Sequence, residues 1–311
     1  MKSLPLFLTC IVLLAVRCDI TSKDLQEFTD IVKNNRTLNK LWPIINHGKM
    51  GGYFTYSNFW QIYKELAKEF PQYVSERKVL GKTYLGNNIY YFKIGDNIND
   101  RGRNNRSELL FTALHHAREP TSLSLIVTIL IDQLKTIVAS KGKNLLYHAI
   151  DIVFIPIVNV DTYKIISDAY GTKNWYRSKM LRKNRRNQDS CGRWKTGVDL
   201  NRNYGYMWNF NPTDGGSNED CDIDYRGTKA FSEPETLAMK NFIEKNTKIV
   251  SCMNFHAWGD LWIHPYNYTR DRRNTPLRKQ HRFWKVYDEF SKNSPHMPYA
   301  KFGNAQATIE Y

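Results

Sequence analysis

The sequence contains no internal repeat and no low-complexity tract, and this absence excludes a solenoid or another repeat array. It also contains no helix-turn-helix, zinc-finger or RNA-binding signature, although its formal net charge is +15 and its pI is near 9.5. We therefore expect no nucleic-acid partner. The stretch from Lys173 to Lys195 is dense in Lys and Arg, and we interpret it as a solvated basic face or as a surface that attracts acidic partners.

The N-terminus carries an apolar run, Leu4 to Val16, that is too short to span a bilayer. Lys2 precedes this run, and cleavage near Cys18 would expose Asp19. The pattern is typical of a secretory signal peptide over residues 1–18, with a membrane anchor as the alternative. We expect a protein without a membrane span that lies outside the cell or in a secretory or lysosomal compartment.

Cysteine is scarce, with five residues in the whole chain. Cys10 and Cys18 would leave with the signal peptide. An oxidising compartment permits disulfides, so Cys191 and Cys221 form a plausible bridge, while Cys252 lies in an apolar run and is expected to be a buried thiol. Three glycosylation sequons fit a secreted surface and begin at Asn35, Asn105 and Asn267.

An imidazole and a carboxylate stand three residues apart in the stretch from His115 to Pro120, directly after the apolar run Leu109–Leu114. At the end of a strand, His116 and Glu119 could face one point, and zinc accepts both kinds of ligand. The motif is weak when it stands alone, because His116 could cap a sheet edge and Glu119 could favour a helix N-terminus. A catalytic zinc site keeps three protein ligands, so one more is required.

Strand and helix patterns alternate along the chain, which predicts an α/β fold around a largely parallel or mixed sheet. Residues 164–230 have little periodicity and are expected to form long loops. The expected strands are Lys78–Leu85 and Ile89–Ile94 as a hairpin, Glu108–Leu114, Ala149–Val158, Ile249–Phe255 and Leu261–His264. The expected helices are Ser57–Phe70 with Ser57 as a candidate cap, one that begins at Pro120, Ser232–Asn246 and Leu277–Phe290.

Residues 19–52 are polar and loosely patterned, so we interpret them as a short segment that precedes the domain. Residues 53–311 are expected to form one catalytic domain. His256 follows the apolar strand 249–255, at the position where open α/β sheets place ligand-binding residues. A single histidine at a strand end is more often a hydrogen-bonded structural residue. With His116 and Glu119 at another strand end, His256 becomes the candidate for the third ligand.

Between these motifs lies the segment Val198-Asp199-Leu200-Asn201-Arg202-Asn203. Together with His116-Ala117-Arg118-Glu119 and His256, it resembles the zinc carboxypeptidases of the carboxypeptidase A type, from about Tyr53 to the last residue. The resemblance implies a mixed, largely parallel central sheet with helices on both faces. It also implies a monomer that holds one Zn²⁺ per chain and hydrolyses the C-terminal peptide bond of peptides or proteins. The implied zinc ligands are His116, Glu119 and His256.

The resemblance also implies roles for residues around the metal. Asn201 and Arg202 would hold the free C-terminal carboxylate of the substrate, for which a guanidinium provides two charge-assisted hydrogen bonds. Arg182 would polarise the scissile carbonyl, and Asp199 would orient His116 through its second ring nitrogen. The alternatives are that Asn201 and Arg202 stabilise only a loop, and that the basic neighbours of Arg182 serve only solubility.

Two further substrate contacts follow from the same resemblance. Arg118 would face a more distant part of the peptide, and Tyr311 would close over the bound C-terminus. Cys191 and Cys221 correspond approximately to the disulfide pair of the family.

The sequence departs from the family pattern in several places. Ala257-Trp258 follows His256 where the family has Ser-Tyr, and Asn159-Val160-Asp161-Thr162 stands where Asn-Pro-Asp-Gly is usual. The glutamate that acts as general base has no counterpart, and the match ends at Tyr311, so we expect the C-terminal part of the domain to be missing. Without a general base, hydrolysis should lose on the order of 10²–10⁴ in rate. The alternative to an enzyme is a non-catalytic module that binds zinc and peptide C-termini.

Overall fold

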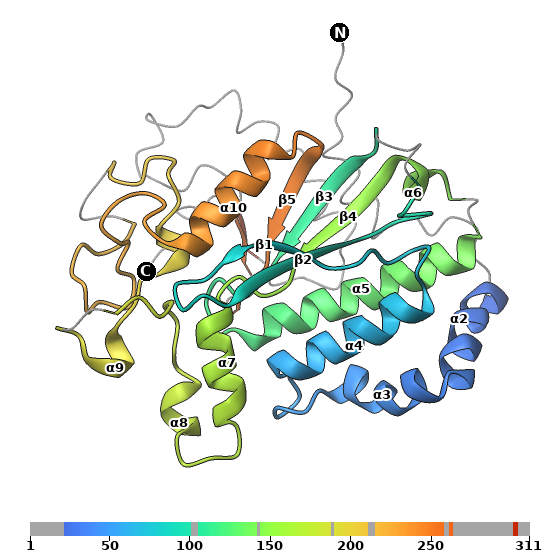
Figure 1. The fold of residues 1–311 in the computed structure, drawn as a ribbon, viewed down its shortest axis with the longest axis horizontal. Helices are drawn as coiled ribbons and strands as arrows, with labels where there is room; N and C mark the ends of the chain where they lie inside the picture. Colours follow the sequence, from blue (N-terminus) through green and yellow to red (C-terminus); the bar gives the residue numbers. More distant parts are fainter. Residues whose placement is uncertain are drawn as a thin grey trace, which may run out of the picture.

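A five-stranded sheet forms the centre of the protein, with its strands in the order β1-β2-β4-β3-β5 (Figure 1). The computed structural model describes residues 22–100, 105–141, 144–187, 190–210, 215–257, 261–263 and 301–303. The strands are β1 (Lys78–Lys82), β2 (Asn88–Ile94), β3 (Ser107–Thr112), β4 (Ile150–Ile155) and β5 (Ile249–Asn254).

The pairing of these strands confirms the mixed α/β class. β1 and β2 form the expected antiparallel hairpin, and β2 also pairs antiparallel with β4. β3 pairs parallel with both β4 and β5, so the C-terminal ends of these three strands lie along one edge of the sheet. A separate parallel pair joins β6 (Leu261–Ile263) and β7 (Lys301–Gly303).

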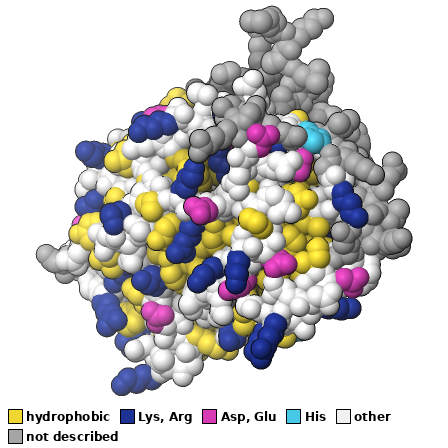
Figure 2. All heavy atoms as spheres, turned by 45° about the vertical axis from the view of Figure 1, so that its right-hand side comes forward, with side chains coloured by type: hydrophobic (Ala, Val, Ile, Leu, Met, Phe, Trp, Pro, Cys, Tyr) yellow, Lys and Arg dark blue, Asp and Glu magenta, His cyan; other side chains and the backbone are white. Residues whose placement is uncertain are grey.

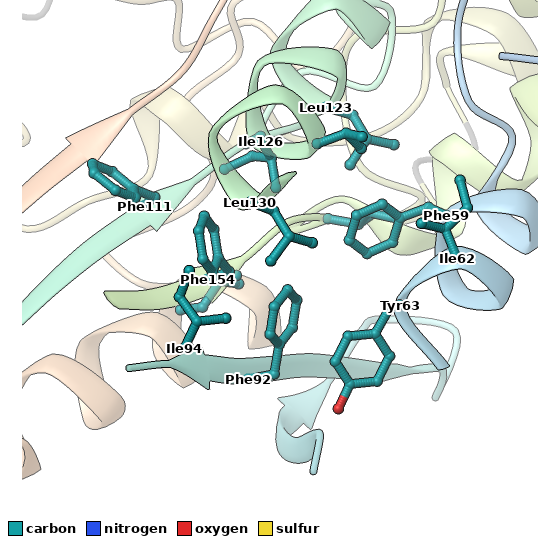
Figure 3. Close-up of a cluster of buried hydrophobic side chains, with 14 of the residues drawn as sticks. Phe59, Ile62, Tyr63, Phe92, Ile94, Phe111, Leu123, Ile126, Leu130 and Phe154 are labelled. Atoms are coloured by element: carbon teal, nitrogen blue, oxygen red, sulfur yellow. The ribbon is translucent and has the colours of Figure 1, made fainter. Parts of the chain in front are cut away.

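Helices cover both faces of the sheet (Figure 1). α4 (Tyr56–Glu69) and α5 (Pro120–Ser140) lie on one face, and α10 (Pro234–Lys245) lies on the other. Figure 3 shows the apolar side chains of α4 and α5 pointing toward aromatic and aliphatic side chains of the sheet. Burying each such side chain contributes about 1.5–3 kcal/mol, which fixes the sheet against its helices. The labelled residues are Phe59, Ile62 and Tyr63 from α4, Leu123, Ile126 and Leu130 from α5, and Phe92, Ile94, Phe111 and Phe154 from the strands.

α5 is a core helix that begins at Pro120, which occupies the first helical position as expected. Within the described part of the chain, it is the one helix long and apolar enough to cross a membrane by length and composition. In the most apolar 18-residue stretch of this helix, 61% is buried inside the protein. Its apolar residues therefore serve the packing against the sheet.

Two helices that the sequence did not predict lie within residues 19–52. α2 (Ser22–Asn34) buries Phe28 and Val32, and α3 (Arg36–His47) buries Leu38. The ring of Phe28 stacks on that of Phe70, with centroids 5.4 Å apart. The interpretation of this segment as loosely patterned is wrong for residues 22–47, because their few apolar side chains recur at helical spacing and join the core. The domain boundary near residue 53 stays a prediction.

Several local expectations need correction. The N-cap of α4 is Thr55, whose side chain accepts a hydrogen bond from the backbone N–H of Asn58, and Ser57 lies inside the helix. Cys252 on β5 is exposed, because side chains alternate along the strand and its own points away from the core.

Residues 164–230 are only partly loops. They include the end of α7 (Val160–Ala169), α8 (Trp175–Ser178), α9 (Gly192–Lys195) and the 3₁₀ helix η1 (Leu200–Arg202). The disulfide between Cys191 and Cys221 is confirmed. Five predictions fall outside the described residues: the signal peptide 1–18, the helix 277–290, the sequon at Asn267, and the roles of Trp258 and Tyr311.

Basic side chains on the face shown in Figure 2 are spread singly among apolar and acidic ones. Arg177, Arg193 and Lys195, within the basic stretch 173–195, are exposed, as a solvated face requires. Lys183 and Arg186 differ from that expectation. The ammonium group of Lys183 donates to the backbone oxygens of Asp220 (2.9 Å) and Asp222 (2.7 Å), and Arg186 forms an ion pair with the buried Glu233. Part of the basic stretch is therefore structural.

Candidate metal centre

The ends of two neighbouring parallel strands bring the predicted ligands together. Thr112, the last residue of β3, is paired with Asn254, the last residue of β5. The backbone N–H of Phe255 also donates to the backbone oxygen of Thr112 (2.8 Å), which carries the pairing one residue beyond the strands. His116 and His256 follow shortly after these ends. Parallel neighbours place their C-terminal ends side by side, so the two histidines meet.

The turn between β3 and α5 sets the directions of His116 and Glu119. Leu114 has a left-handed backbone conformation (φ 54°), which turns the chain out of the strand. Pro120 at the start of α5 disfavours a helical conformation for Glu119, which precedes it. The backbone oxygen of Glu119 accepts a hydrogen bond from the hydroxyl group of Ser122 (2.7 Å). The carboxylate of Glu119 is thereby held beside the ring of His116.

One ligand atom from each of His116, Glu119 and His256 lies within 4.8 Å of those of the other two. Nδ1 of His116 is 2.7 Å from Oε1 of Glu119, and Nδ1 of His256 is 2.9 Å from Oε2 of Glu119. The two Nδ1 atoms are 3.1 Å apart. His116 and Glu119 are 4% and 6% exposed. The convergence of these three side chains, expected from the sequence, is present.

The chemistry of this cluster fits a metal cation. Both ring nitrogens of His116 face carboxylates, because Nε2 also lies 3.1 Å from Oδ1 of Asp199. A neutral imidazole carries one N–H, so one of these contacts needs an additional positive charge, either a proton or a metal ion. One proton can bridge only two of the converging nitrogen and oxygen atoms, whereas one divalent cation can bind all of them. Two nitrogens and a carboxylate are a ligand set that zinc accepts.

Glu119 is held in its ionised form. Burial favours the neutral acid, but the hydrogen-bonding contacts with His116 and His256 outweigh burial and lower the pKa of Glu119 to about 2. The carboxylate is therefore available as a ligand throughout the neutral range.

Asp199 lies behind His116 and connects it to Arg182. Burial opposes its ionisation, but the hydrogen bond from His116 and the charges of Arg202 and Arg182 hold the pKa of Asp199 below its usual range. Its Oδ2 accepts from Nε of Arg182 (2.8 Å), and its Oδ1 accepts from the backbone N–H of Asn201 (2.9 Å). Nη1 of Arg182 lies 3.9 Å from Oε1 of Glu119. Arg182 thus stands at the edge of the metal cluster.

The residues predicted to hold a substrate carboxylate lie on η1, which Asp199 caps. Nη1 of Arg202 donates to the backbone oxygen of Asn201 (3.3 Å), and the buried Nε of Arg202 has no hydrogen-bond partner among the described residues. This N–H could donate a hydrogen bond to an anionic partner. Burial, assisted by the nearby charge of Arg182, lowers the pKa of Arg118, which places Arg118 in the same cationic environment. Tyr311 lies outside the described residues.

His115, the neighbour of His116, points to a different partner. Its Nε2 lies 2.7 Å from the hydroxyl group of Tyr204. Burial lowers the pKa of His115 to about 3, assisted by the other two imidazoles, so its ring is neutral at pH 7. The pair of adjacent histidines therefore divides into one candidate ligand, His116, and one buried hydrogen-bonded ring, His115.

Two buried asparagines anchor the segment that carries Asp199, Asn201 and Arg202. At its start, Oδ1 of Asn184 accepts from the backbone N–H of Val198 (2.8 Å), and Nδ2 of Asn184 donates to Oε2 of Glu233 (2.7 Å). At its end stands Asn203, whose amide group makes five hydrogen bonds. Its partners are the backbone oxygens of Arg226 and Lys229, the hydroxyl groups of Ser232 and Thr236, and the backbone N–H of Glu233.

Sequence reasoning gave these two asparagines no role. Asn203 belongs to a motif that the sequence analysis identified, so its position there was a usable signal. Nothing in the pattern around Asn184 indicated its role.

The start of α10 contains a buried carboxyl group, Glu235, whose titration should affect stability. Burial raises the pKa of Glu235 to about 7 from 4.5, although the backbone N–H of Tyr84 donates to it (3.0 Å). Between about pH 4.5 and 7 the folded protein therefore keeps a proton that the unfolded chain has lost. The free energy of unfolding should fall as pH rises through this window, by roughly 2–3 kcal/mol between pH 5 and pH 8.

Glu235→Gln should remove most of this fall, which urea titrations at several pH values would measure. Glu244→Gln is the matched control, because Glu244 is an exposed residue of the same helix. If the free energy of unfolding of the Glu235→Gln protein fell with pH as steeply as that of the unmodified protein, the buried carboxyl group would not be the source of the fall.

Comparisons with known proteins agree on one family. A family model described as zinc carboxypeptidase matches residues 60–311. Human mast cell carboxypeptidase A is 32% identical over 224 residues, which cover 70% of this chain and 48% of that protein. The inactive metallocarboxypeptidase ECM14 of Ajellomyces capsulatus is 30% identical over 213 residues, covering 66% of this chain and 32% of that protein.

A solved structure gives the same result at the level of the fold. Bovine thrombin-activatable fibrinolysis inhibitor, in complex with a tick carboxypeptidase inhibitor, aligns with a TM-score of 0.62 and 25% identity. The alignment covers 81% of this chain and 76% of that chain. The chain spans about half the length of human mast cell carboxypeptidase A (48%) and of bovine carboxypeptidase B (45%).

Proposed function

Because the chain belongs to the zinc carboxypeptidase family, we propose that it is a zinc-dependent metallocarboxypeptidase that hydrolyses the C-terminal peptide bond of peptides or proteins. The observation that carries this proposal is the convergence of His116, Glu119 and His256 at the ends of β3 and β5. These three side chains would hold one Zn²⁺, which supplies Lewis-acid chemistry when it is bound.

The surrounding residues would orient the ligands and the substrate. Asp199 accepts the Nε2–H of His116 and so keeps the Nδ1 lone pair directed at the metal position. Arg182, which lies between Asp199 and Glu119, would donate its remaining N–H groups to the carbonyl oxygen of the scissile bond. Asn201 and Arg202 would bind the free carboxylate of the substrate. Arg118 and Tyr311 are proposed contacts with other parts of the bound peptide.

A second function is supported by one relative. The Ajellomyces capsulatus protein that is 30% identical is named an inactive metallocarboxypeptidase. The alternative is therefore a module that binds zinc and peptide C-termini without cleaving them. Secretion and a monomeric state stay predictions from the sequence.

The preference for a free C-terminus tests the proposed function. We expect purified protein that contains zinc to act on, or bind, a peptide with a free C-terminus about 10- to 100-fold better than its amidated twin. The reason is that hydrogen bonds to charged groups contribute about 1.5–3 kcal/mol. Cleavage and binding are measured on the same two peptides, by chromatography of the products and by calorimetry.

The variants give this experiment its specificity. Arg202→Gln should abolish the preference for the free peptide, whereas Arg193→Gln, which changes an exposed arginine outside the site, should retain it. Binding of the free peptide without cleavage would favour the non-catalytic module. Equal treatment of the free and amidated peptides by the unmodified protein would contradict both functions.

A further inference from the structure

Asn254, to which the sequence analysis gave no role, contacts the ring nitrogen of His256 that does not face Glu119. Nε2 of His256 lies 2.9 Å from Nδ2 of Asn254, two residues earlier on β5. Oδ1 of Asn254 in turn accepts a hydrogen bond from the hydroxyl group of Thr112 on β3 (3.0 Å). Thr112 and Asn254 are cross-strand partners. The exposed amide group of Asn254 therefore connects the strand that leads to His116 with the ring of His256.

The orientation of this amide determines which nitrogen of His256 carries the proton. In the present arrangement Asn254 donates to Nε2, so the proton of a neutral ring is on Nδ1. Nδ1 then donates to Oε2 of Glu119, 2.9 Å away. This tautomer satisfies the contact between His256 and Glu119 in the metal-free site. It cannot bind a metal through Nδ1, because a metal ligand needs an unprotonated nitrogen.

Rotation of the amide by 180° supports the other tautomer. Oδ1 of Asn254 would then accept the Nε2–H of His256, and Nδ2 would donate to the hydroxyl oxygen of Thr112. Threonine can exchange its donor role for an acceptor role, because its hydroxyl group does both. Nδ1 of His256 would present its lone pair to Glu119 and His116, at the metal position.

We propose that Asn254 is the positioning residue of His256, and that its amide group reverses when the site takes up zinc. The proposal rests on the proposed zinc site. His116 is oriented by a carboxylate, Asp199, which can only accept and therefore supports the zinc-binding tautomer alone. His256 is oriented by an amide, which supports both tautomers. The second imidazole would thus form stable contacts with and without the metal.

Zinc affinity measures the role of Asn254 directly, by competition with a chromophoric chelator. Asn254→Leu should lower the affinity about 10- to 100-fold, which is the usual effect of removing a partner behind a metal-binding histidine. Asn254→Asp should bind zinc at least as tightly as the unmodified protein, because a carboxylate accepts the Nε2–H of His256. Asn218→Leu changes an exposed asparagine outside the site and should leave the affinity unchanged.

Nitrogen NMR of the His256 ring supplies a readout that a purely structural role would not change. In the unmodified protein the proton should move from Nδ1 to Nε2 when zinc is added, with the signals assigned by their loss in His256→Ala. In Asn254→Asp the proton should already be on Nε2 before zinc is added. A proton on Nε2 in both states of the unmodified protein would overturn the reversal of the amide.

The same titrations distinguish failure of this inference from failure of the proposed function. If the unmodified protein binds no zinc, or if His116→Ala binds it equally well, the metal site itself is wrong. If His116→Ala loses zinc and Asn254→Leu keeps the full affinity, Asn254 does not position His256, and the zinc site stands without it.

Discussion

Replacement of Glu119 by glutamine is expected to weaken zinc binding at least about 100-fold. Structural zinc sites with four ligands have apparent binding free energies of about 10–16 kcal/mol, so each ligand contributes about 3 kcal/mol, which corresponds to about 100-fold. Glutamine keeps the shape of the side chain but removes the negative charge that lies beside both Nδ1 atoms. Competition with a chromophoric chelator at pH 7 measures the change.

The fold of the Glu119→Gln protein should survive. In the metal-free state the amide can still contact the two imidazoles, and near-ultraviolet circular dichroism would show intact packing around the aromatic core. Glu244→Gln, which removes an exposed carboxylate from α10, should bind zinc as the unmodified protein does. Zinc affinity within threefold of the unmodified protein in the Glu119→Gln variant would remove the carboxylate from the ligand set.

Asn203→Ala should lower the free energy of unfolding by about 3–5 kcal/mol. The buried amide makes five hydrogen bonds to the segment 226–236. Truncation would leave several buried partners unsatisfied, and each unsatisfied group costs about 1–3 kcal/mol where water cannot replace the amide. Part of this cost is recovered by relaxation of the loop. Urea unfolding followed by tryptophan fluorescence measures the loss.

Asn201→Ala is the matched control, two residues earlier in the same segment. The side chain of Asn201 is partly exposed, so its truncation should change stability by less than about 1 kcal/mol. Under the proposed function, however, it should weaken binding of a free peptide C-terminus. A loss below about 1 kcal/mol in Asn203→Ala as well would show that Asn203 does not anchor the segment.

The sequence predicted the elements in which a clear hydrophobic period coincides with strong boundary residues. β4 is nearly continuously apolar, and α5 begins at a proline, so both were predicted within a few residues. α2 was missed because polar residues outnumber the apolar ones in it, and α3 because it contains Pro43, a residue that is unusual inside a helix. Their helical pattern gains its meaning from packing partners such as Phe70, which lies far along the chain.

The candidate site also contains some residues that the sequence reveals and others that it does not. His116, Glu119 and His256 were predicted because strand ends and ligand types are visible in a sequence. The side chains of Arg182 and Lys183 point in different directions. That of Arg182 reaches Asp199, while that of Lys183 points to the loop at Asp220 and Asp222.

The three asparagines that orient or anchor the site could not be predicted in the same way. The hydrogen-bond partners of Asn184, Asn203 and Asn254 are distant in sequence or lie on a paired strand. A single asparagine also produces no periodic pattern in a sequence. Only the fold identifies the partners of these asparagines.

The parallel pairing of β3 with β5 also has a consequence during synthesis of the protein. His116 and His256 are 140 residues apart in the chain, so a growing chain on the ribosome contains two of the three proposed ligands long before the third is made. β5 must emerge and dock before the ion can be held. Acquisition of the metal should therefore be a late event in biogenesis, and cellular zinc supply would act on the newly folded chain rather than on its early intermediates.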